Sequence, residues 1–196
     1  MNRPVDWESC YKSGETPWDK GEPAPGLVDF LEHQIPFHHP DILVPGCGLG
    51  HDAKALAGRG YDVIGLDLAP TAVQRAAEAS GKGSVRFQAG DFLRLQGRGG
   101  FGGLFEHTLF CAIPLEQRDA YVKSAAAQVR SGGHFLAIHY LNPRDPAGPP
   151  FGVSRAEILE RFTPHFELLA EWIPRSFPGR ENRERMLWWR RRTKGT

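Results

Sequence analysis

Apolar residues follow two spacings in turn along the chain, and these spacings predict strands and helices that alternate. Short aliphatic runs bounded by turn residues predict buried strands, whereas apolar residues three and four positions apart predict amphipathic helices. The predicted strands are Asp41–Pro45, Tyr61–Asp67, Ser84–Gln88, Leu104–Phe110, His134–Tyr140, Phe166–Ile173 and Arg185–Arg191. The predicted helices are Leu27–Gln34, His51–Ala57, Pro70–Ser80, Leu115–Arg130 and a helix that begins at Ser154.

Capping residues support several of these boundaries. Pro70 suits the first turn of a helix, because backbone N–H groups there make no hydrogen bond within the helix and proline lacks this group. Ser154 is followed three residues later by Glu157, which is the pattern of a capping box. Ser131-Gly132-Gly133 is expected to end the long helix before the fifth strand begins.

Strands that alternate with helices need crossover connections, which favour a mainly parallel sheet with helices on both faces. The last two predicted strands have no long helix between them, so we expect an antiparallel hairpin at one edge. The expected fold is an α/β domain with a mostly parallel, seven-stranded sheet. Ligands of such sheets bind beyond the carboxyl ends of the strands, where the strand order reverses.

The first 25 residues differ from the rest of the chain. Trp7, Tyr11 and Trp18 stand there among Gly, Pro and charged residues, with few aliphatic side chains. We therefore expect this segment to supply no core element. We expect it instead to fold over a pocket as a lid, with its aromatic side chains turned inward.

Composition and charge exclude several classes of protein. The chain has 196 residues, with 24 Lys and Arg against 23 Asp and Glu, and a formal net charge of +1. One domain covering residues 1–196 is expected at this length, and the near-neutral balance argues against nucleic acid as a partner. We interpret the basic run Trp188–Arg192 as an edge strand followed by a solvated tail. No apolar run approaches the roughly 20 residues that span a bilayer, so no membrane partner is expected.

Cysteine usage and the first residues predict the compartment. The chain holds three cysteines, Cys10, Cys47 and Cys111. An odd number without a Cys-x-x-Cys pair favours reduced thiols over disulfides or structural zinc. The amino terminus has no apolar signal-peptide core, so we expect a cytoplasmic protein and, as its simplest state, a monomer. His33, His38 and His39 lack a third ligand at a convincing spacing, so no metal site is expected.

A glycine-rich loop follows the first predicted strand. Gly46, Gly48 and Gly50 allow positive φ angles and let a ligand approach the backbone, although a simple tight turn gives the same pattern. Asp67 ends the second strand, seventeen residues after Gly50, where a carboxylate accepts hydrogen bonds from ribose hydroxyls. Its alternative role is to cap the helix that begins at Pro70. Loop and acid together predict a nucleoside-bearing ligand.

Two further features distinguish between possible nucleosides. Asp91 and Phe92 follow the third strand, where a polar and a flat apolar side chain suit an adenine ring. The nicotinamide dinucleotide fingerprint needs glycine six positions into the loop, where this chain has His51. S-adenosylmethionine has no phosphate, and aromatic faces stabilise its sulfonium by roughly 0.5–2 kcal/mol. The N-terminal aromatic residues favour S-adenosylmethionine as the cofactor.

Seven segments carry a resemblance to a known family. They are Trp7-x-x-x-Tyr11, Gly14-x-Thr16-Pro17-Trp18-Asp19-x-Gly21, Val44-Pro45-Gly46-Cys47-Gly48-x-Gly50-x-Asp52, Gly65-x-Asp67, Gly90-Asp91-Phe92, Phe110-Cys111-Ala112-Ile113-Pro114 and Gly148-Pro149-Pro150-Phe151-x-Val153. In this order and over roughly residues 7–160, they resemble the thiopurine methyltransferase family of class I S-adenosylmethionine-dependent methyltransferases. The resemblance is closest to the thiol/halide methyltransferase branch.

The resemblance implies a single Rossmann-like methyltransferase domain, with the N-terminal aromatic segment closing over cofactor and acceptor. The cofactor-binding residues that it implies are Trp7, Tyr11, Trp18, Gly46, Cys47, Gly48, Asp67, Leu68, Asp91 and Phe92. The chain departs from the pattern at His107, where the thiol/halide branch has tyrosine and the thiopurine branch arginine. It also has Phe101-Gly102-Gly103 without the acid that often follows that phenylalanine. The first departure leaves the identity of the methyl acceptor open.

Methyl transfer from a sulfonium is an in-line displacement with a neutral leaving group, so no acid is needed. Its catalysis is mainly positioning, which contributes up to roughly 7–11 kcal/mol. A thiol acceptor gains from a base, for which His107 and Tyr140 are candidates, while a halide needs none. Asp19 is a candidate for orienting lid or acceptor. Cys111 either lines the acceptor pocket or is simply a buried small side chain.

The sequence therefore predicts an S-adenosylmethionine-dependent methyltransferase without a metal, acting on a small acceptor such as a thiol, another sulfur compound or a halide. A non-catalytic protein that binds S-adenosylmethionine as a sensor or partner is the alternative from another class, because fold does not imply turnover. An NAD(P)-dependent oxidoreductase is the weaker alternative.

Overall fold

Strands and helices alternate along the computed structural model, which describes residues 5–33, 37–80, 85–95, 99–141 and 148–193. The strands are β1 Asp41–Pro45, β2 Asp62–Asp67, β3 Val85–Ala89, β4 Phe101–His107, β5 Val129–Tyr140, β6 Phe166–Trp172 and β7 Glu184–Arg191. The α-helices are α1 Trp7–Ser13, α2 Pro25–His33, α3 His51–Ala57, α4 Pro70–Glu78, α5 Arg118–Gln128 and α6 Arg155–Phe162. Two short 3-10 turns are η1 Phe92–Arg94 and η2 Leu115–Gln117.

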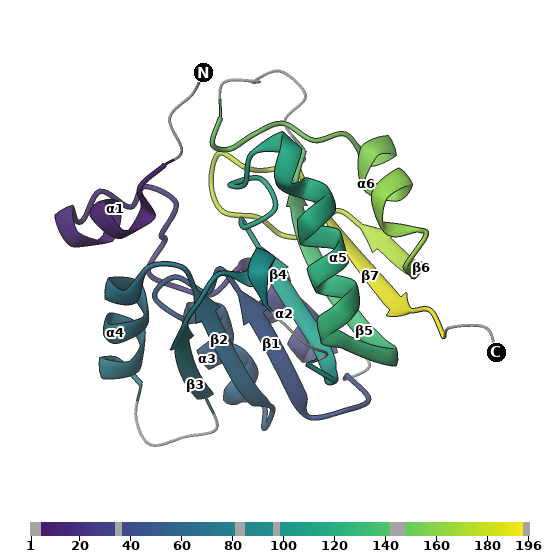
Figure 1. Ribbon diagram of the computed structural model, residues 1–196, viewed down its shortest axis with the longest axis horizontal. Coiled ribbons are helices and arrows are strands. Elements are labelled where there is room, and N and C mark those ends of the chain that lie inside the picture. Colours follow the sequence, from purple (N-terminus) through teal and green to yellow (C-terminus); the bar gives the residue numbers. More distant parts are fainter. Residues whose placement is uncertain (1–4, 34–36, 81–84, 96–98, 142–147, 194–196) are drawn as a thin grey trace.

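The strands described form one sheet with the order β3-β2-β1-β4-β5-β7-β6 (Figure 1). β1 to β5 run parallel to one another, whereas β7 is antiparallel to both β5 and β6. The expected α/β fold with a mostly parallel seven-stranded sheet and an antiparallel hairpin is confirmed. The strand order reverses between β1 and β4, which places the expected ligand site at the carboxyl ends of these strands.

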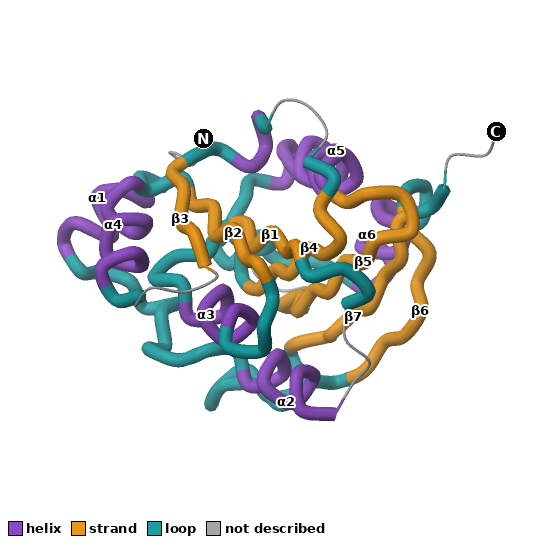
Figure 2. The backbone as a smooth tube through the Cα atoms, turned by 90° about the horizontal axis from the view of Figure 1, so that it is seen from below, coloured by secondary structure: helices purple, strands orange, loops and turns teal. Residues whose placement is uncertain are grey.

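Helices bury both faces of the sheet, as Figure 2 shows. One core contains the apolar residues of α2 and α3, including Leu27, Phe30 and Leu56. The opposite core contains those of α5 and α6, including Tyr121 and Phe162. Because both faces are covered, the inner strands are continuous apolar runs rather than alternating ones. The predicted boundaries of the strands before residue 90 therefore differ from the observed ones by only one residue.

Two glycines allow β3 to lie close to the glycine-rich loop. A Cβ on Gly50 would lie 2.5 Å from the Phe87 ring, and a Cβ on Gly65 would lie 2.6 Å from the same ring. Gly50 also has a φ of +79°, in the left-handed region. The third glycine of the loop is thus required for packing between elements as well as for its backbone conformation.

The predicted strand Leu104–Phe110 was wrong at both ends, since β4 runs from Phe101 to His107. Gly102 and Gly103 belong to the strand because their missing side chains leave space for the residues before β1. A Cβ on Gly103 would lie 2.5 Å from the ring of Phe37. The end shifts because the chain turns after His107, with the Glu106 carboxyl group accepting bonds from the turn.

The long helix was also predicted too long. A 3-10 turn at Leu115–Gln117 precedes α5, which ends at Gln128, and β5 begins at Val129 rather than at His134. The segment Ser131–Gly133 lies within β5, where the pairing with β4 shifts register. Gly132 has a φ of +75°, so these residues form an irregularity in a strand and do not cap a helix.

Three other expectations need correction. The N-terminal segment was expected to supply no core element, yet it forms α1 and buries Tyr11. The strand that contains Trp188 and Trp189 was expected at the sheet edge, but β7 lies between β5 and β6, and Trp189 is fully buried. Gln34 and Ser84, which bounded two predicted elements, lie outside the described residues.

The packing at Gly50 generates a stability prediction. Gly50→Ala should lower the free energy of unfolding by roughly 2–5 kcal/mol, because strain at positive φ adds to overlap with Phe87. Gly60→Ala is the matched control, since Gly60 has a φ of +89° and nothing lies within 4 Å of its Cβ position. This control should lose only roughly 1–2 kcal/mol. Urea denaturation measures both, and equal losses would show that the contact with Phe87 has no energetic effect.

Candidate active site

The carboxyl ends of neighbouring strands bring the predicted site residues to one edge of the sheet (Figure 1). The glycine-rich loop follows β1, Asp67 ends β2, and Asp91 follows β3. His107 ends β4 and Tyr140 ends β5. The topology therefore places these residues, which are far apart in the sequence, where ligands of such sheets bind.

A buried carboxylate holds the glycine-rich loop in place. Asp67 Oδ2 accepts a hydrogen bond of 2.8 Å from the Gly48 amide, and its Oδ1 accepts one of 2.9 Å from the Ala69 amide. Burial raises the pKa of Asp67, and these two amides oppose that effect. Gly46 and Gly48 have φ angles of +62° and +52°. Asp67 therefore binds the loop and the residue that precedes α4, but it does not cap α4, whose N-cap is Ala69 without a side-chain bond. The role of Asp67 toward ribose hydroxyls stays a prediction.

An exposed leucine adjoins this carboxylate. Leu68 is 56% exposed, which leaves an apolar surface beside Asp67. Phe92, by contrast, is 5% exposed and packs edge-on against Tyr121. Asp91 caps η1 through a 2.9 Å hydrogen bond from the amide of residue 93. Leu68, which is expected to bind the cofactor, therefore offers a ligand much more surface than Phe92, which is expected to contact adenine.

The predicted aromatic lid packs against the glycine-rich loop. Trp18 Nε1 donates a hydrogen bond of 3.2 Å to the Tyr11 hydroxyl, and the rings of Trp7 and Trp18 meet edge-on at 5.2 Å. The Tyr11 hydroxyl lies 2.8 Å from the position of a Cβ on Gly48. Figure 1 shows α1 beside α4. The structure therefore brings the three aromatic residues together and places them against the glycine-rich loop.

A carboxylate on α1 anchors the lid to α4. Glu8 accepts two hydrogen bonds from Thr71, one of 3.0 Å from its amide and one of 2.7 Å from its hydroxyl. The Thr71 amide is one of the unpaired donors in the first turn of α4, so Glu8 replaces the missing side-chain cap.

Cys47, another predicted site residue, lies in the glycine-rich loop. Its amide donates a hydrogen bond to the carbonyl of residue 66, and burial raises the pKa of its thiol.

Asp19 binds neighbours at the start of α3. Its Oδ1 accepts a hydrogen bond of 3.0 Å from the Gly21 amide and lies 3.2 Å from His51 Nε2. Asp52, the next residue of α3, accepts a hydrogen bond of 2.7 Å from the Ala24 amide. These contacts tie the end of the lid segment to the helix after the glycine-rich loop, which agrees with a lid-orienting role for Asp19.

A buried histidine joins three elements farther along the same edge. The His107 side chain is 8% exposed, and its Nε2 lies 3.3 Å from Glu184 Oε1 on β7. Its Nδ1 lies 3.8 Å from Asp52 Oδ2 on α3. Arg180 Nη1 stands 3.5 Å from the same Nε2, and the ring of Phe177 stacks at 6.3 Å. The connection between β6 and β7 thus covers His107.

The carboxylates decide the charge of His107. Burial alone favours the neutral imidazole, but Asp52 and Glu184, which face its two ring nitrogens, outweigh burial and raise the pKa of His107 to about 9. At neutral pH both nitrogens therefore carry protons. The hypothesis that His107 is a base needs a free lone pair, which this arrangement does not provide.

The other two acceptor-side candidates have different surroundings. The Tyr140 hydroxyl accepts a hydrogen bond of 3.4 Å from Arg183, and the Arg180 guanidinium lies 5.7 Å from the centre of its ring. Cys111 is buried, and burial raises the pKa of its thiol to about 12. A buried thiol of this kind agrees with the role of a small apolar side chain. Arg180 links Tyr140 to His107.

Sequence reasoning missed the partners that define this side of the site, Arg180, Glu184 and Phe177. They lie in or just after a connection without periodic pattern, so no local signal marked them. Asp52 stood within a quoted motif but was assigned no role.

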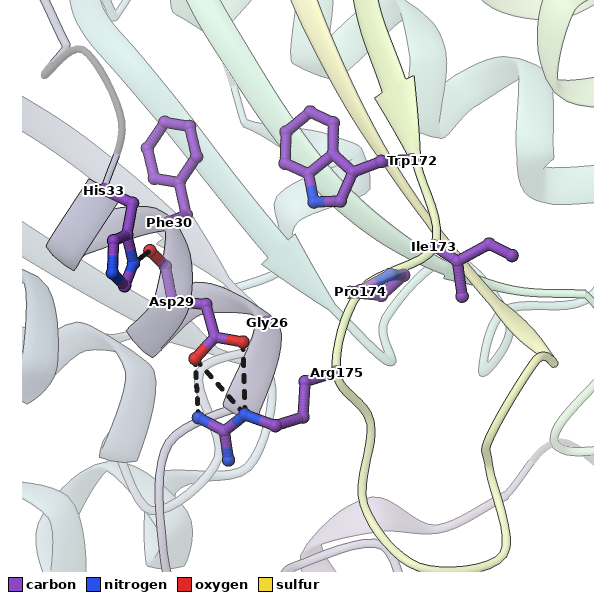
Figure 3. A pocket seen from close by; sticks show the side chains of 8 residues that line it. All are labelled: Gly26, Asp29, Phe30, His33, Trp172, Ile173, Pro174 and Arg175. Atoms are coloured by element: carbon purple, nitrogen blue, oxygen red, sulfur yellow. Dashed lines mark hydrogen bonds and ion pairs between the residues drawn. The ribbon is translucent and has the colours of Figure 1, made fainter.

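A shallow hollow of about 250 Å³ lies away from these residues, between α2 and the segment after β6 (Figure 3). It is lined by Gly26, Asp29, Phe30, His33, Trp172, Ile173, Pro174 and Arg175. At its rim Arg175 donates a 2.7 Å hydrogen bond to Asp29. Both side chains are exposed, so the pair contributes little stability, but it fixes where the connection to Arg180 starts.

Within the described ranges, no His, Cys, Asp and Glu side chains form a group of three or more that suits a metal ion. The expectation that no metal is needed stays a prediction. In the same ranges, no helix combines the length and the apolar character that crossing a bilayer requires.

Known proteins share this sequence pattern. The family model described as Thiopurine S-methyltransferase (TPMT) matches residues 2–172. The chain belongs to the thiopurine S-methyltransferase family. It is therefore an S-adenosylmethionine-dependent S-methyltransferase. The resemblance to this family that the sequence motifs carry is confirmed.

Individual proteins that are similar to this methyltransferase are consistent with its place in the family. Thiocyanate methyltransferase 1 of Brassica oleracea is 31% identical over 94% of this chain and 84% of the relative. The 2-heptyl-1-hydroxyquinolin-4(1H)-one methyltransferase of Mycobacteroides abscessus is 34% identical over 79% of this chain and 73% of the relative. In fold, the chain is similar to 1,6-didemethyltoxoflavin-N1-methyltransferase of Burkholderia thailandensis, with a TM-score of 0.76 at 20% identity, covering 98% and 92% of the two chains.

The charge of His107 can be measured directly. An NMR titration of its imidazole should give a midpoint near 9, and a midpoint below 7 would contradict the assignment. A folded pKa above the unfolded value of about 6.5 gives stabilisation that is complete below pH 6.5 and lost as pH rises through 9. The free energy of unfolding of wild type relative to His107→Gln should therefore decline over this window.

Proposed function

We propose that this methyltransferase transfers a methyl group to a small acceptor that arrives as an anion, such as a thiolate, thiocyanate or a halide. The observation that carries this proposal is the surroundings of His107. Both of its ring nitrogens face carboxylates, so it is protonated at neutral pH and unable to accept a proton. An acceptor that is already ionised needs no base. The names of relatives, which include thiocyanate and thiol methyltransferases, support this choice.

The residues at the carboxyl edge fit S-adenosylmethionine. The loop presents backbone at Gly46 and Gly48 that no side chain of its own screens, Asp67 has its carboxylate oxygens beside the loop, and Leu68 offers an apolar surface. Tyr11 and its indole partners cover the loop. When bound, the cofactor supplies a methyl group on a sulfonium sulfur, which leaves as a neutral thioether.

The chain's own residues mainly hold the reacting groups in position and keep water away from them. The aromatic lid, anchored through Glu8, shields the loop from solvent. His107 joins α3 to β7 as an imidazolium, and Arg180 places a second positive charge next to Tyr140. Asp52 and Glu184 balance the charges of His107 and Arg180, whereas Arg183 places a further guanidinium at the Tyr140 hydroxyl, where it attracts an anionic acceptor. We therefore assign acceptor binding to the side of the site around Tyr140 and Arg180.

Two finer expectations stay predictions, a monomeric state and a cytoplasmic location. The alternative of a non-catalytic sensor of S-adenosylmethionine receives no support from membership of a family of S-methyltransferases. The nicotinamide-dependent alternative receives no support from family membership.

The role of Asp67 in holding the cofactor is tested by binding. Asp67→Ala should weaken binding of S-adenosylhomocysteine by roughly 1–3 kcal/mol, because hydrogen bonds to a charged group are lost and the Gly48 amide loses its acceptor. Isothermal titration calorimetry measures the change. Asp62→Ala, at the other end of β2, is the control and should bind normally. An unchanged dissociation constant for Asp67→Ala would remove this residue from the site, and thermal stabilisation by NADH would contradict the choice of cofactor.

The absence of a base gives a prediction for acceptor kinetics. Between pH 6 and 8, kcat/KM for a small thiol should rise about tenfold per pH unit, following the thiolate of a thiol with pKa about 8.5. For thiocyanate and iodide, kcat/KM should stay flat over this range. Initial rates with these acceptors, a thiopurine and an N-hydroxyquinolone provide the test. A rise with pH for thiocyanate would reveal an enzyme base, and cofactor binding without turnover of any acceptor would favour the sensor.

A further inference from the structure

A carboxyl group without a role in the proposed function lies beneath the turn after β4. Glu106 is fully buried. Its Oε2 accepts hydrogen bonds of 3.1 Å from the amides of both Leu109 and Phe110. Buried amides at this point have left the strand and have not entered a helix, so they need an acceptor from a side chain. The Glu106 carboxyl group supplies it.

The turn that Glu106 holds touches two parts of the site. The Leu109 side chain lies 3.0 Å from the position of a Cβ on Gly46, so it rests on the glycine-rich loop. The Cys111 carbonyl accepts a hydrogen bond of 2.6 Å from the Phe151 amide, in the segment of the Gly-Pro-Pro-Phe motif. A shift of the turn would therefore move the contacts with both the cofactor loop and this segment.

The backbone of the turn does not adopt its shape unaided. Thr108 has a φ of +71°, a conformation that β-branched residues rarely take. Such a conformation persists only where surrounding contacts impose it. Hydrogen bonds within the turn support this conformation, since the Thr108 hydroxyl donates to the His107 carbonyl and the Ala112 amide donates to the Leu109 carbonyl. The two hydrogen bonds to Glu106 join the turn to β4 of the sheet.

The second oxygen of Glu106 faces another buried group. Glu106 Oε1 lies 3.4 Å from His139 Nδ1 on β5, and neither atom has a hydrogen-bond partner in the described part of the chain. Burial raises the pKa of Glu106 to about 7 and lowers the pKa of His139 to about 3. Below pH 7 the proton therefore belongs to Glu106, where Oε1 is placed to share it with His139. Oε2 stays available to the two amides.

We propose that Glu106 is a positioning residue for methyl transfer, whose side chain fixes the turn Thr108–Ala112 and so sets the glycine-rich loop relative to Phe151. What matters is the reach of an oxygen to both amides, not a negative charge. The kinetic consequence rests on the proposed function, whereas the structural consequence does not depend on it.

Two variants separate reach from charge. Glu106→Gln keeps the length, since its amide oxygen can accept from Leu109 and Phe110 while its NH2 group replaces the proton shared with His139. Glu106→Asp keeps the carboxyl group but is one methylene shorter, so it cannot reach both amides. Asp41→Ala is the matched control, because Asp41 accepts from the Gly102 amide at the opposite end of β4.

The structural readout is hydrogen exchange at the Leu109 and Phe110 amides, followed by NMR. Glu106→Gln should keep wild-type protection, and Glu106→Asp should exchange at least tenfold faster at these two amides. The kinetic readout uses thiocyanate and S-adenosylmethionine. Glu106→Gln should keep kcat within threefold, whereas Glu106→Asp should lose roughly 30- to 100-fold in kcat, because small displacements of reacting groups are this costly. KM for thiocyanate and the dissociation constant of S-adenosylhomocysteine should change less than fivefold.

Several outcomes would overturn the inference. They are wild-type exchange or kcat in Glu106→Asp, equal losses in both Glu106 variants, and an equal loss of kcat in Asp41→Ala. If wild type transfers a methyl group to no acceptor, the proposed function fails, while hydrogen exchange alone still decides the role of Glu106. If Glu106→Asp does not fold, near-normal kcat and protection in Glu106→Gln support the proposal, and their loss overturns it.

Discussion

Backbone amides that leave the carboxyl ends of parallel strands must find acceptors, and in this protein buried carboxyl groups provide them. Asp67 accepts from Gly48 and the start of α4, and Glu106 accepts from Leu109 and Phe110. A buried amide without an acceptor destabilises a fold by about 1–3 kcal/mol, so these carboxyl groups are structural requirements. They also stand at the carboxyl ends of the strands, where ligands of such sheets bind. The side chains that shape the loops and those that bound the site are therefore partly the same.

Local pattern was sufficient for the first half of the fold. β1, α3 and β2 are buried aliphatic runs or good helix formers bounded by glycine, and their limits follow from neighbouring residues alone. The limits of β4 and β5 instead depend on distant partners. Gly103 joins β4 because the Phe37 ring occupies the space of its missing side chain, and the strand stops where Glu106 bends the chain. The helix α1 has local caps at Asp6 and Gly14, but its place against α4 depends on Glu8 and Thr71, which are 63 residues apart.

The site shows the same division. The glycine-rich loop, Asp67 and the aromatic lid could be predicted because each is marked by residue type and spacing. The charge of His107 could not, since it depends on Asp52 and on Glu184, which are 55 and 77 residues away in the sequence. Arg180 and Glu184 also lie beyond residues 2–172, the part that the family model matches. The position at which this chain departs from the family pattern thus contacts residues beyond the part that the family model matches.

The place of β7 in the sheet has a consequence for how the protein is made. β7 is the last strand in the sequence, yet it lies between β5 and β6. While the chain is being synthesised, β6 leaves the ribosome with no strand to pair with, and the open edge of β5 stays available to other chains. Long-range pairing of this kind is slow and exposes nascent chains to aggregation. Because Glu184 begins β7, the pairing of this strand with β5 also brings Glu184 to His107. The order of the sheet and the surroundings of His107 therefore depend on the same strand.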